Sequence, residues 1–215
     1  MTGRGASAPG AGIPRAALEA LAEADAFRAF GLDRRAALWA IRGLAGAPLP
    51  LFAAAETAAA DSAEPAVRLP PLPAGGEVMA DYRSLGLSLR AHPVAFLRAA
   101  LARQGMIACA GLARARDGAR VTVPGLVLVR QRPGSARGVL FITIEDETGF
   151  ANLIVWPDRF ERQRRLILSA GMVAARGRVQ REGEVMHVIV EELTDLSALL
   201  ARVGGALRVP TRDFR

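Results

Sequence analysis

The 215-residue sequence contains no lysine, so all 28 of its basic side chains are arginine. It has a single cysteine, Cys109, which excludes an internal disulfide and a multi-cysteine metal site. Aromatic residues make up only 5% of the chain, and no apolar run approaches the roughly 18 residues that a membrane-spanning helix needs. The first residues also lack the apolar segment of a signal peptide. We therefore expect a cytoplasmic protein without a membrane segment, with a disordered start at residues 1–12.

The charge balance is basic: 28 arginines stand against 21 acidic residues, which gives a net charge of +7 at pH 7. The planar guanidinium group suits phosphate and stacks on bases, so an arginine-only basic chain is compatible with a nucleic-acid partner. The missing lysine has a second explanation, because a GC-rich genome encodes chains that are rich in alanine and arginine. The net charge is thus weak evidence for nucleic-acid binding.

Residues 13–44 have the apolar spacing of two short helices, and Asp33 is a candidate cap for the second. Gly31 stands between two apolar residues where the helices meet. This arrangement is typical of a helix-hairpin-helix, whose loop amides meet a DNA phosphate, and it makes Gly31 a candidate DNA contact. The pattern fits equally well a plain helical hairpin that packs through three aromatic residues, Phe27, Phe30 and Trp39.

Residues 45–76 are dominated by proline and alanine and follow no helix or strand period, which predicts a linker. Within it, Pro48–Phe52 resembles the short Gln-Leu-x-Leu-Phe peptides that dock in the cleft of the bacterial sliding clamp. The candidate clamp contacts are Leu49, Leu51 and Phe52. Against this interpretation, Pro48 replaces the glutamine of the motif, and Leu51 and Phe52 equally fit packing against the preceding helices.

Residues 77–112 return to helical spacing and are predicted to form a helical connector. His92 stands directly before Pro93 at the predicted start of a helix. That position favours helix capping or packing over catalysis, because no carboxylate or cysteine partner is suggested nearby.

Residues 113–194 are predicted to form an OB-fold barrel, because apolar residues alternate with a period of two from Arg120 onward. The five strand candidates are residues 121–130, 138–146, 150–156, 172–181 and 184–192. One helix is predicted at residues 157–168, between the third and fourth strands, which is the order of an OB-fold. Residues 195–215 are left as a C-terminal tail. The expected fold class is α+β, with a helical hairpin, a linker, a helical connector and a five-stranded OB-fold barrel.

Strand alternation sorts the side chains of the barrel into two sets. In the second strand Leu140, Ile142 and Ile144 are expected inside, which turns Phe141 and Thr143 outward. An outward aromatic beside arginines is what single-stranded DNA binding requires. The candidate DNA contacts in the barrel are Arg130, Gln131, Arg132, Arg137, Phe141, Thr143, Asn152, Arg176, Arg178 and Gln180. In the alternative interpretation Phe141 covers the mouth of the barrel.

The sequence offers no catalytic or metal-binding residue. Asp146 and Glu147 are adjacent acids, and in a strand successive side chains point to opposite faces, which makes them a poor metal pair. Neither His92 nor His187 lies in a nucleophile or zinc motif. A phosphate-binding glycine loop, a G-x-S-x-G motif and a zinc ligand set are all missing.

Several segments carry a family resemblance, above all Leu126–Gly138 and Ile144–Gly149. The others are Glu23–Phe27, Gly31–Trp39, Leu87–Pro93, Gly177–Gly183 and Arg212–Phe214. In these segments the sequence resembles the C-terminal part of the error-prone DNA polymerases, bacterial C-family paralogues of the polymerase III alpha subunit. The similarity runs from about Gly12 to the last residue.

The resemblance implies a role in translesion synthesis during damage-induced mutagenesis, a form of DNA repair and replication. It implies a helix-hairpin-helix that contacts duplex DNA and an OB-fold domain that handles the template strand. The implied partners are single-stranded or primer–template DNA, other mutasome proteins and the sliding clamp. In the family, the catalytic palm with its metal-binding aspartates lies upstream of the matched region. No cofactor is therefore expected in this chain, since magnesium belongs to the missing polymerase domain.

Two functions from different classes follow. The first is the DNA-binding C-terminal part of an error-prone DNA polymerase, without activity on its own. The alternative is an interaction adaptor that recruits other mutasome proteins and touches DNA only incidentally. Salt separates the two, because binding through several arginines weakens steeply with salt and an apolar docking surface does not.

Overall fold

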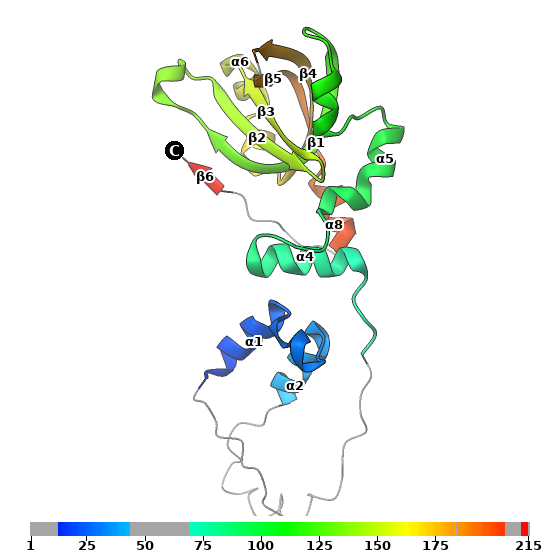
Figure 1. Ribbon diagram of the computed structural model, residues 1–215. Coiled ribbons are helices and arrows are strands. Elements are labelled where there is room, and N and C mark those ends of the chain that lie inside the picture. Colours follow the sequence, from blue (N-terminus) through cyan, green and yellow to red (C-terminus); the bar gives the residue numbers. More distant parts are fainter. Residues whose placement is uncertain (1–12, 44–68, 184, 205–211, 215) are drawn as a thin grey trace, which may run out of the picture. The chain divides into compact units, whose positions relative to one another are not determined.

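The computed structural model describes residues 13–43, 69–183, 185–204 and 212–214 (Figure 1). The chain divides into two compact units, residues 1–72 and residues 73–215. Most of the predicted linker, the predicted disordered start and the candidate clamp contacts Leu49, Leu51 and Phe52 lie outside the described residues. None of the helices in the described ranges is long and apolar enough to cross a membrane.

The first unit is a helical hairpin made of α1 (Arg15–Glu23), the 3-10 helix η1 (Ala26–Phe30) and α2 (Arg34–Gly43). Gly31 ends η1 with a φ of 78°, in the left-handed region that glycine enters without steric cost. Asp33 accepts a hydrogen bond from the Ala36 amide at 2.8 Å, so its predicted capping role is confirmed.

The core of the hairpin consists of the buried side chains Ala22, Ala37 and Ile41. The alternative interpretation has three aromatic residues packing the hairpin, but of these only Phe27 lies against this core. Phe30 is 79% exposed and Trp39 is 56% exposed, so the prediction is wrong for both. Two of the three buried core residues are alanines, and Leu18, Phe27 and Leu38 pack against them as partly buried side chains.

The second unit contains a closed barrel of five strands, as the sequence predicts (Figure 1). The strands are β1 (Arg120–Gln131), β2 (Leu140–Asp146), β3 (Gly149–Val155), β4 (Met172–Glu182) and β5 (Val185–Asp195). They pair in the order β2-β3-β5-β4-β1, and β1 also pairs with β2, which closes the barrel. Strands β3 and β5 are parallel, while the other barrel pairs are antiparallel.

The predicted alternation of β2 is observed: Leu140, Ile142 and Ile144 are buried in the barrel core. The single helix expected between β3 and β4 is instead two short helices, α6 (Pro157–Arg162) and α7 (Arg164–Ser169). The break falls at Gln163, whose side chain donates to the Leu193 carbonyl at 2.7 Å and accepts from the Leu193 amide at 2.9 Å. This pair of bonds attaches the helical segment to β5.

A second core covers one end of the barrel. It is built by α4 (Ala74–Leu85), η2 (Pro93–Leu97), α5 (Arg98–Arg103) and α8 (Ser197–Gly204), together with buried residues from β1 and β4. Val78, Val94 and Leu200 meet Leu126 and Met172 there. Helices that precede the barrel in sequence and the helix that follows it therefore share one apolar cluster. The predicted helical connector and the predicted C-terminal tail thus pack against each other.

His92 caps η2, because its Nδ1 accepts a hydrogen bond from the Val94 amide at 3.2 Å. The capping prediction is confirmed. After η2 and α5, the 3-10 helix η3 (Cys109–Arg114) leads into β1. At the other end of the unit, the short strand β6 (Arg212–Phe214) pairs in parallel with Val129–Gln131 of β1.

Gly177 marks an irregularity in the β4–β5 ladder. The register shifts between Arg176 and Gly177, which leaves Glu191 as an extra residue on β5. A Cβ atom at Gly177 would lie 2.1 Å from the backbone oxygen of Ile189, so no side chain fits without moving the ladder. The bulge therefore depends on glycine through close backbone approach.

We expect Gly177→Ala to lower the free energy of unfolding by about 1–3 kcal/mol, because overpacking forces backbone shifts. Gly134→Ala is the matched control, since a Cβ atom at Gly134 meets nothing within 4 Å. Denaturant titration of both variants measures the difference. Equal stability of the two variants would contradict the close approach at Gly177.

Candidate nucleic-acid interface

A row of side chains crosses the outside of the barrel from strand to strand. The register places Phe141 of β2 opposite Gln131 of β1 on one side and Ile154 of β3 on the other. Ile154 faces Ile189 of β5, and Ile189 faces Arg178 of β4. Phe141, Ile154 and Ile189 are half-buried. We call Gln131, Phe141, Ile154, Ile189 and Arg178 the apolar row. It presents one half-buried aromatic ring beside two half-buried isoleucines, and it ends at an arginine.

A polar row runs beside the apolar row. Thr143 Oγ1 donates to Asn152 Oδ1 at 3.2 Å, Asn152 lies opposite His187 of β5, and His187 lies opposite Gln180 of β4. Phe150, at the start of β3, is 70% exposed. The candidate contacts Phe141, Thr143 and Asn152 are thus brought together on one face of the barrel.

The loop between β1 and β2 carries two exposed candidate arginines, Arg132 and Arg137. The guanidinium carbon of Arg132 lies 4.9 Å from the centre of the buried Phe160 ring, and that of Arg164 lies 5.3 Å from it. The first of these cation–π contacts holds Arg132 against α6. Arg137 ends the short helix η4 (Gly134–Ala136) with a φ of 47°.

The prediction that Arg130 contacts DNA is wrong. It is 4% exposed, and its guanidinium donates to the carbonyl oxygens of Ile167 at 2.6 Å and Ala170 at 2.5 Å. It therefore stabilises the end of α7 and does not face a ligand. The cause is a bulge in β1 between Val127 and Val129, which reverses the alternation and turns Arg130 inward.

The candidates on β4 keep their predicted orientation, because Arg176, Arg178 and Gln180 alternate with buried residues. Arg178 and Arg176 are ion-paired, with Glu191 at 3.1 Å and with Glu192 at 3.6 Å. Gln180 donates to Glu182 at 2.7 Å. These side chains are on β4, and in the strand order β3 and β5 lie between β4 and the strand that carries Phe141.

Gly31, in the first unit, does not present its amide to a ligand. Its N–H donates to the Arg28 carbonyl at 3.0 Å, and the next amide, that of Leu32, donates to the Phe27 carbonyl at 3.4 Å. Both amides are thus used inside the turn. The prediction that the Gly31 loop binds phosphate through these amides is not supported by this conformation.

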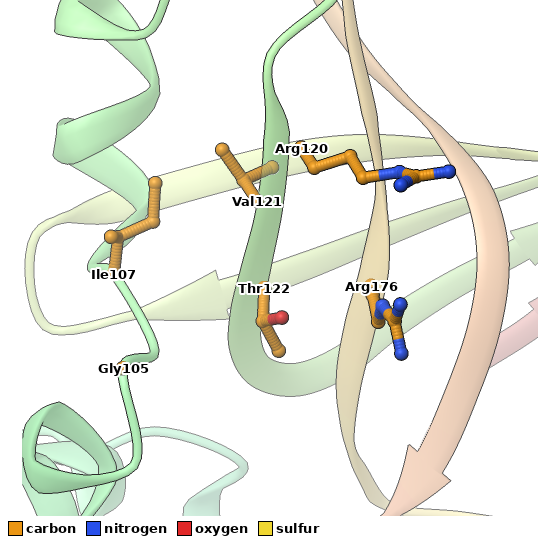
Figure 2. A pocket seen from close by; sticks show the side chains of 6 residues that line it. All are labelled: Gly105, Ile107, Arg120, Val121, Thr122 and Arg176. Carbon is orange, nitrogen blue, oxygen red and sulfur yellow. The ribbon is translucent and has the colours of Figure 1, made fainter.

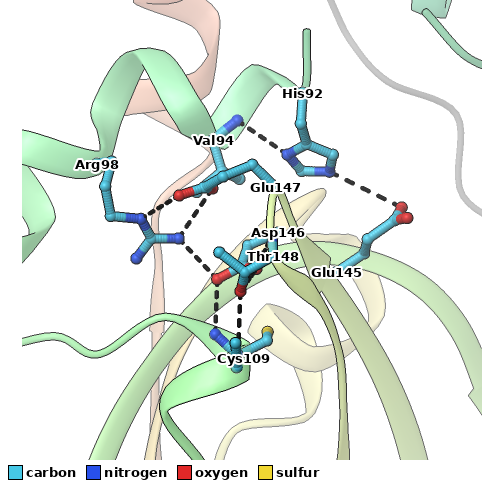
Figure 3. A network of polar contacts seen from close by, with 9 residues as sticks. His92, Val94, Arg98, Cys109, Glu145, Asp146, Glu147 and Thr148 are labelled. Carbon is cyan, nitrogen blue, oxygen red and sulfur yellow. Dashed lines mark hydrogen bonds and ion pairs between the residues drawn. The ribbon is translucent and has the colours of Figure 1, made fainter. Parts of the chain in front are cut away.

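Asp146 is the centre of a polar network that joins the barrel to the helical segment before it (Figure 3). Arg98 of α5 donates to Asp146 at 2.6 Å and to both carboxylate oxygens of Glu147 at 2.5 and 2.9 Å. The Cys109 amide donates to Asp146 at 2.8 Å, and Thr148 donates through its amide at 2.8 Å and its hydroxyl at 2.6 Å. The expectation that Asp146 and Glu147 point apart is wrong, because Glu147 lies in the turn.

The network controls the protonation of Asp146. Burial raises the pKa of this carboxyl group, but hydrogen bonds from Thr148 and Cys109 and the charge of Arg98 outweigh it, so the pKa lies below its usual value of 3.8. Burial is also the main cause of the low pKa of His92, which Glu147 and Asp146 oppose. Within the described ranges, no group of three or more His, Cys, Asp or Glu side chains could hold a metal ion.

The closed barrel and its strand order define the second unit as an OB-fold domain. Residues 121–196 match the family model tRNA_anti-codon, described as an OB-fold nucleic acid binding domain. Among solved structures, the asparaginyl-tRNA synthetase from Pyrococcus horikoshii matches 42% of this chain and 23% of its own, with 24% identity and a TM-score of 0.35.

The particular relatives are polymerases. Error-prone DNA polymerase 1 of Agrobacterium fabrum is 56% identical over 199 residues, which is 90% of this chain and 18% of that protein. Error-prone DNA polymerase 2 of Rhizobium meliloti is 53% identical over 208 residues, which is 93% of this chain and 19% of that protein. The predicted resemblance is confirmed: the chain is homologous to part of the error-prone DNA polymerases and spans about a fifth of their length.

We expect Asp146→Asn to lower the free energy of unfolding at pH 7 by roughly 1.5–3 kcal/mol, because several hydrogen bonds to a buried charge are weakened. Glu147→Gln is the control. The Glu147 carboxylate binds the same arginine, but the Glu147 side chain is partly exposed. We therefore expect this variant to lose less than about 1 kcal/mol of unfolding free energy. Equal losses in the two variants would contradict the central place of Asp146.

The same residue predicts a pH dependence. Since the folded pKa of Asp146 is depressed, its stabilisation is present above the ordinary pKa of 3.8 and is lost as the pH falls through the lower folded value. Unfolding curves of the parent and Asp146→Asn should therefore converge on acidification below about pH 4. Curves that stay parallel would assign the acid sensitivity to other groups.

Proposed function

We propose that this chain is a DNA-binding part of an error-prone DNA polymerase and that its barrel binds single-stranded DNA along the apolar row. The observation that carries the proposal is the position of Phe141 on the outer face of an OB-fold, between Gln131 and Ile154. Base–aromatic stacking tolerates any sequence, because every base has a π-face. Translesion synthesis fits such binding, since a damaged template has no fixed base pattern to read.

The polar groups support the same path. Thr143 and Asn152 place a hydroxyl and an amide beside Phe141, where they can hydrogen-bond to bases or sugars. Arg132 and Arg137 border the row at the β1–β2 loop and supply positive charge for the phosphates. Arg132 is pre-positioned by its contact with Phe160, so less conformational entropy is lost when it binds.

Two further partners stay predictions from the sequence. Clamp binding would depend on Leu49, Leu51 and Phe52, which lie outside the described residues. Docking to other mutasome proteins is implied by the family resemblance. Neither is needed for binding along the apolar row.

Phe141→Ala tests the stacking. We expect a loss of about 1–3 kcal/mol in affinity for a single-stranded oligonucleotide, with a smaller loss for Phe141→Leu, which keeps apolar area. Fluorescence anisotropy measures the affinity, and a thermal melt of each variant reports folding. A large fall in melting temperature with unchanged affinity would make Phe141 a structural residue and remove the proposed role.

Arg132→Gln and Arg137→Gln test the phosphate contacts. For single strands, each lost contact should reduce the slope of log affinity against log salt by about 0.7. Arg162→Gln, which removes an exposed arginine from α6, is the control and should leave the slope unchanged. A parent affinity that does not depend on salt would favour the adaptor function instead.

A further inference from the structure

Three arginines gather on the outer face of the β1–β4 pair, away from Phe141. The register puts Arg120 directly opposite Arg178, and the second pair along places Thr122 opposite Arg176. Like charges directly opposite each other destabilise a sheet. A pair of facing arginines therefore needs negative charge beside it, which a carboxylate of the chain or a bound anion can supply.

The carboxylates nearby neutralise this cluster only in part. Glu191 lies 3.1 Å from Arg178 and 3.4 Å from Arg120, and it reaches both because it is the extra residue of the β5 bulge. Arg176 pairs with Glu192 at 3.6 Å, and both side chains are more than half exposed. Three guanidinium groups thus face two carboxylates. Exposed ion pairs of this kind are weak, so a phosphate can replace a carboxylate at little cost.

A pocket of about 180 Å³ opens beside the cluster (Figure 2). It is lined by Gly105, Ile107, Arg120, Val121, Thr122 and Arg176. The wall opposite the arginines is held in place, because the Ile107 amide donates to the Thr122 carbonyl at 2.9 Å. A Cβ atom at Gly105, which also lines the pocket, would meet nothing within 4 Å.

We propose that this pocket holds a backbone phosphate of the DNA strand that binds along the apolar row; the inference rests on the proposed function. Guanidinium groups bind phosphate through paired N–H donors, and the Thr122 hydroxyl adds a further donor. The strand reaches the pocket by continuing from Ile189 over Arg178. The three strand spacings from Phe141 to Arg178 amount to about 15 Å. OB-fold sites take roughly 4–16 nucleotides, which covers this path.

Oligonucleotide length separates the two sites. The full-length chain is titrated with fluorescent oligothymidines of about 4 and about 16 nucleotides, the limits of known OB-fold site sizes. Arg176→Gln and Arg120→Gln should each lower the salt slope for the long oligonucleotide by about 0.7 and leave the short one unchanged. Arg165→Gln, an exposed arginine of α7, is the matched control.

Glu192→Gln is expected to change the affinity in the opposite direction. It removes the carboxylate that competes for Arg176, so it should strengthen binding of the long oligonucleotide. Melting temperatures like that of the parent show that each variant folds. Inorganic phosphate tests whether the pocket binds free phosphate, and sulfate serves as the salt control. If phosphate competes with the long oligonucleotide more strongly than sulfate does, and Arg176→Gln abolishes this difference, the pocket does not require a DNA strand and the proposal is overturned.

The two proposals fail in different ways. If the parent binds both oligonucleotides and Phe141→Ala weakens both, but Arg120→Gln and Arg176→Gln match the Arg165→Gln control, the pocket proposal is overturned and the proposed function stands. If the parent binds neither oligonucleotide, both proposals are overturned. A reduced slope for the long oligonucleotide alone supports the pocket.

Discussion

The buried carboxylate of Asp146 is the constraint on which the second unit depends. A charged group inside a protein is tolerated only when hydrogen bonds replace its water, and here those bonds come from the turn after β2, from η3 and from α5. Removing any one donor would leave a buried charge short of partners. The barrel and the helical segment before it are therefore joined by a polar junction as well as by apolar packing around Leu126 and Met172.

This junction also fixes the position of the proposed binding surface. Asp146 ends β2, the strand that carries Phe141 and Thr143, and the turn that follows starts β3 with Asn152. Because Arg98 and Cys109 hold that turn, the two strands leave it in fixed register. The outer rows are built on rigid strands, which is the condition for stacking a base without a large loss of conformational entropy.

Much of the barrel could be predicted from the sequence, because strand alternation is a local signal. The inward set Leu140, Ile142 and Ile144 follows from a period of two, and the His92 cap follows from the proline beside it. Arg130 could not be placed in this way. Its inward orientation follows from one extra residue in β1, and a bulge leaves no clear mark in the sequence. The apolar row depends equally on the parallel pairing of β3 with β5, which joins Ile154 to Ile189 across 35 residues of chain.

Helices also contain features that the local sequence pattern does not predict, as the aromatic residues of the first unit and Gln163 show. Apolar spacing predicts where a helix lies, but it does not tell which of several apolar side chains the core selects, and Phe30 and Trp39 are left outside. Gln163 breaks a predicted helix because its side chain satisfies the backbone of β5, a partner 30 residues away. Such choices are made by tertiary contacts and not by local propensity.

The sole cysteine of the chain lies inside the polar junction. Burial, and after it the neighbouring charge of Asp146, raises the pKa of the Cys109 thiol to about 12. The thiolate, which is the reactive form, is therefore almost unpopulated at neutral pH, and alkylation in the native state requires the junction to open. The rate at which Cys109 is alkylated therefore reports how often the junction opens. A cysteine introduced on the surface would carry a fluorescent label with little background from the native thiol.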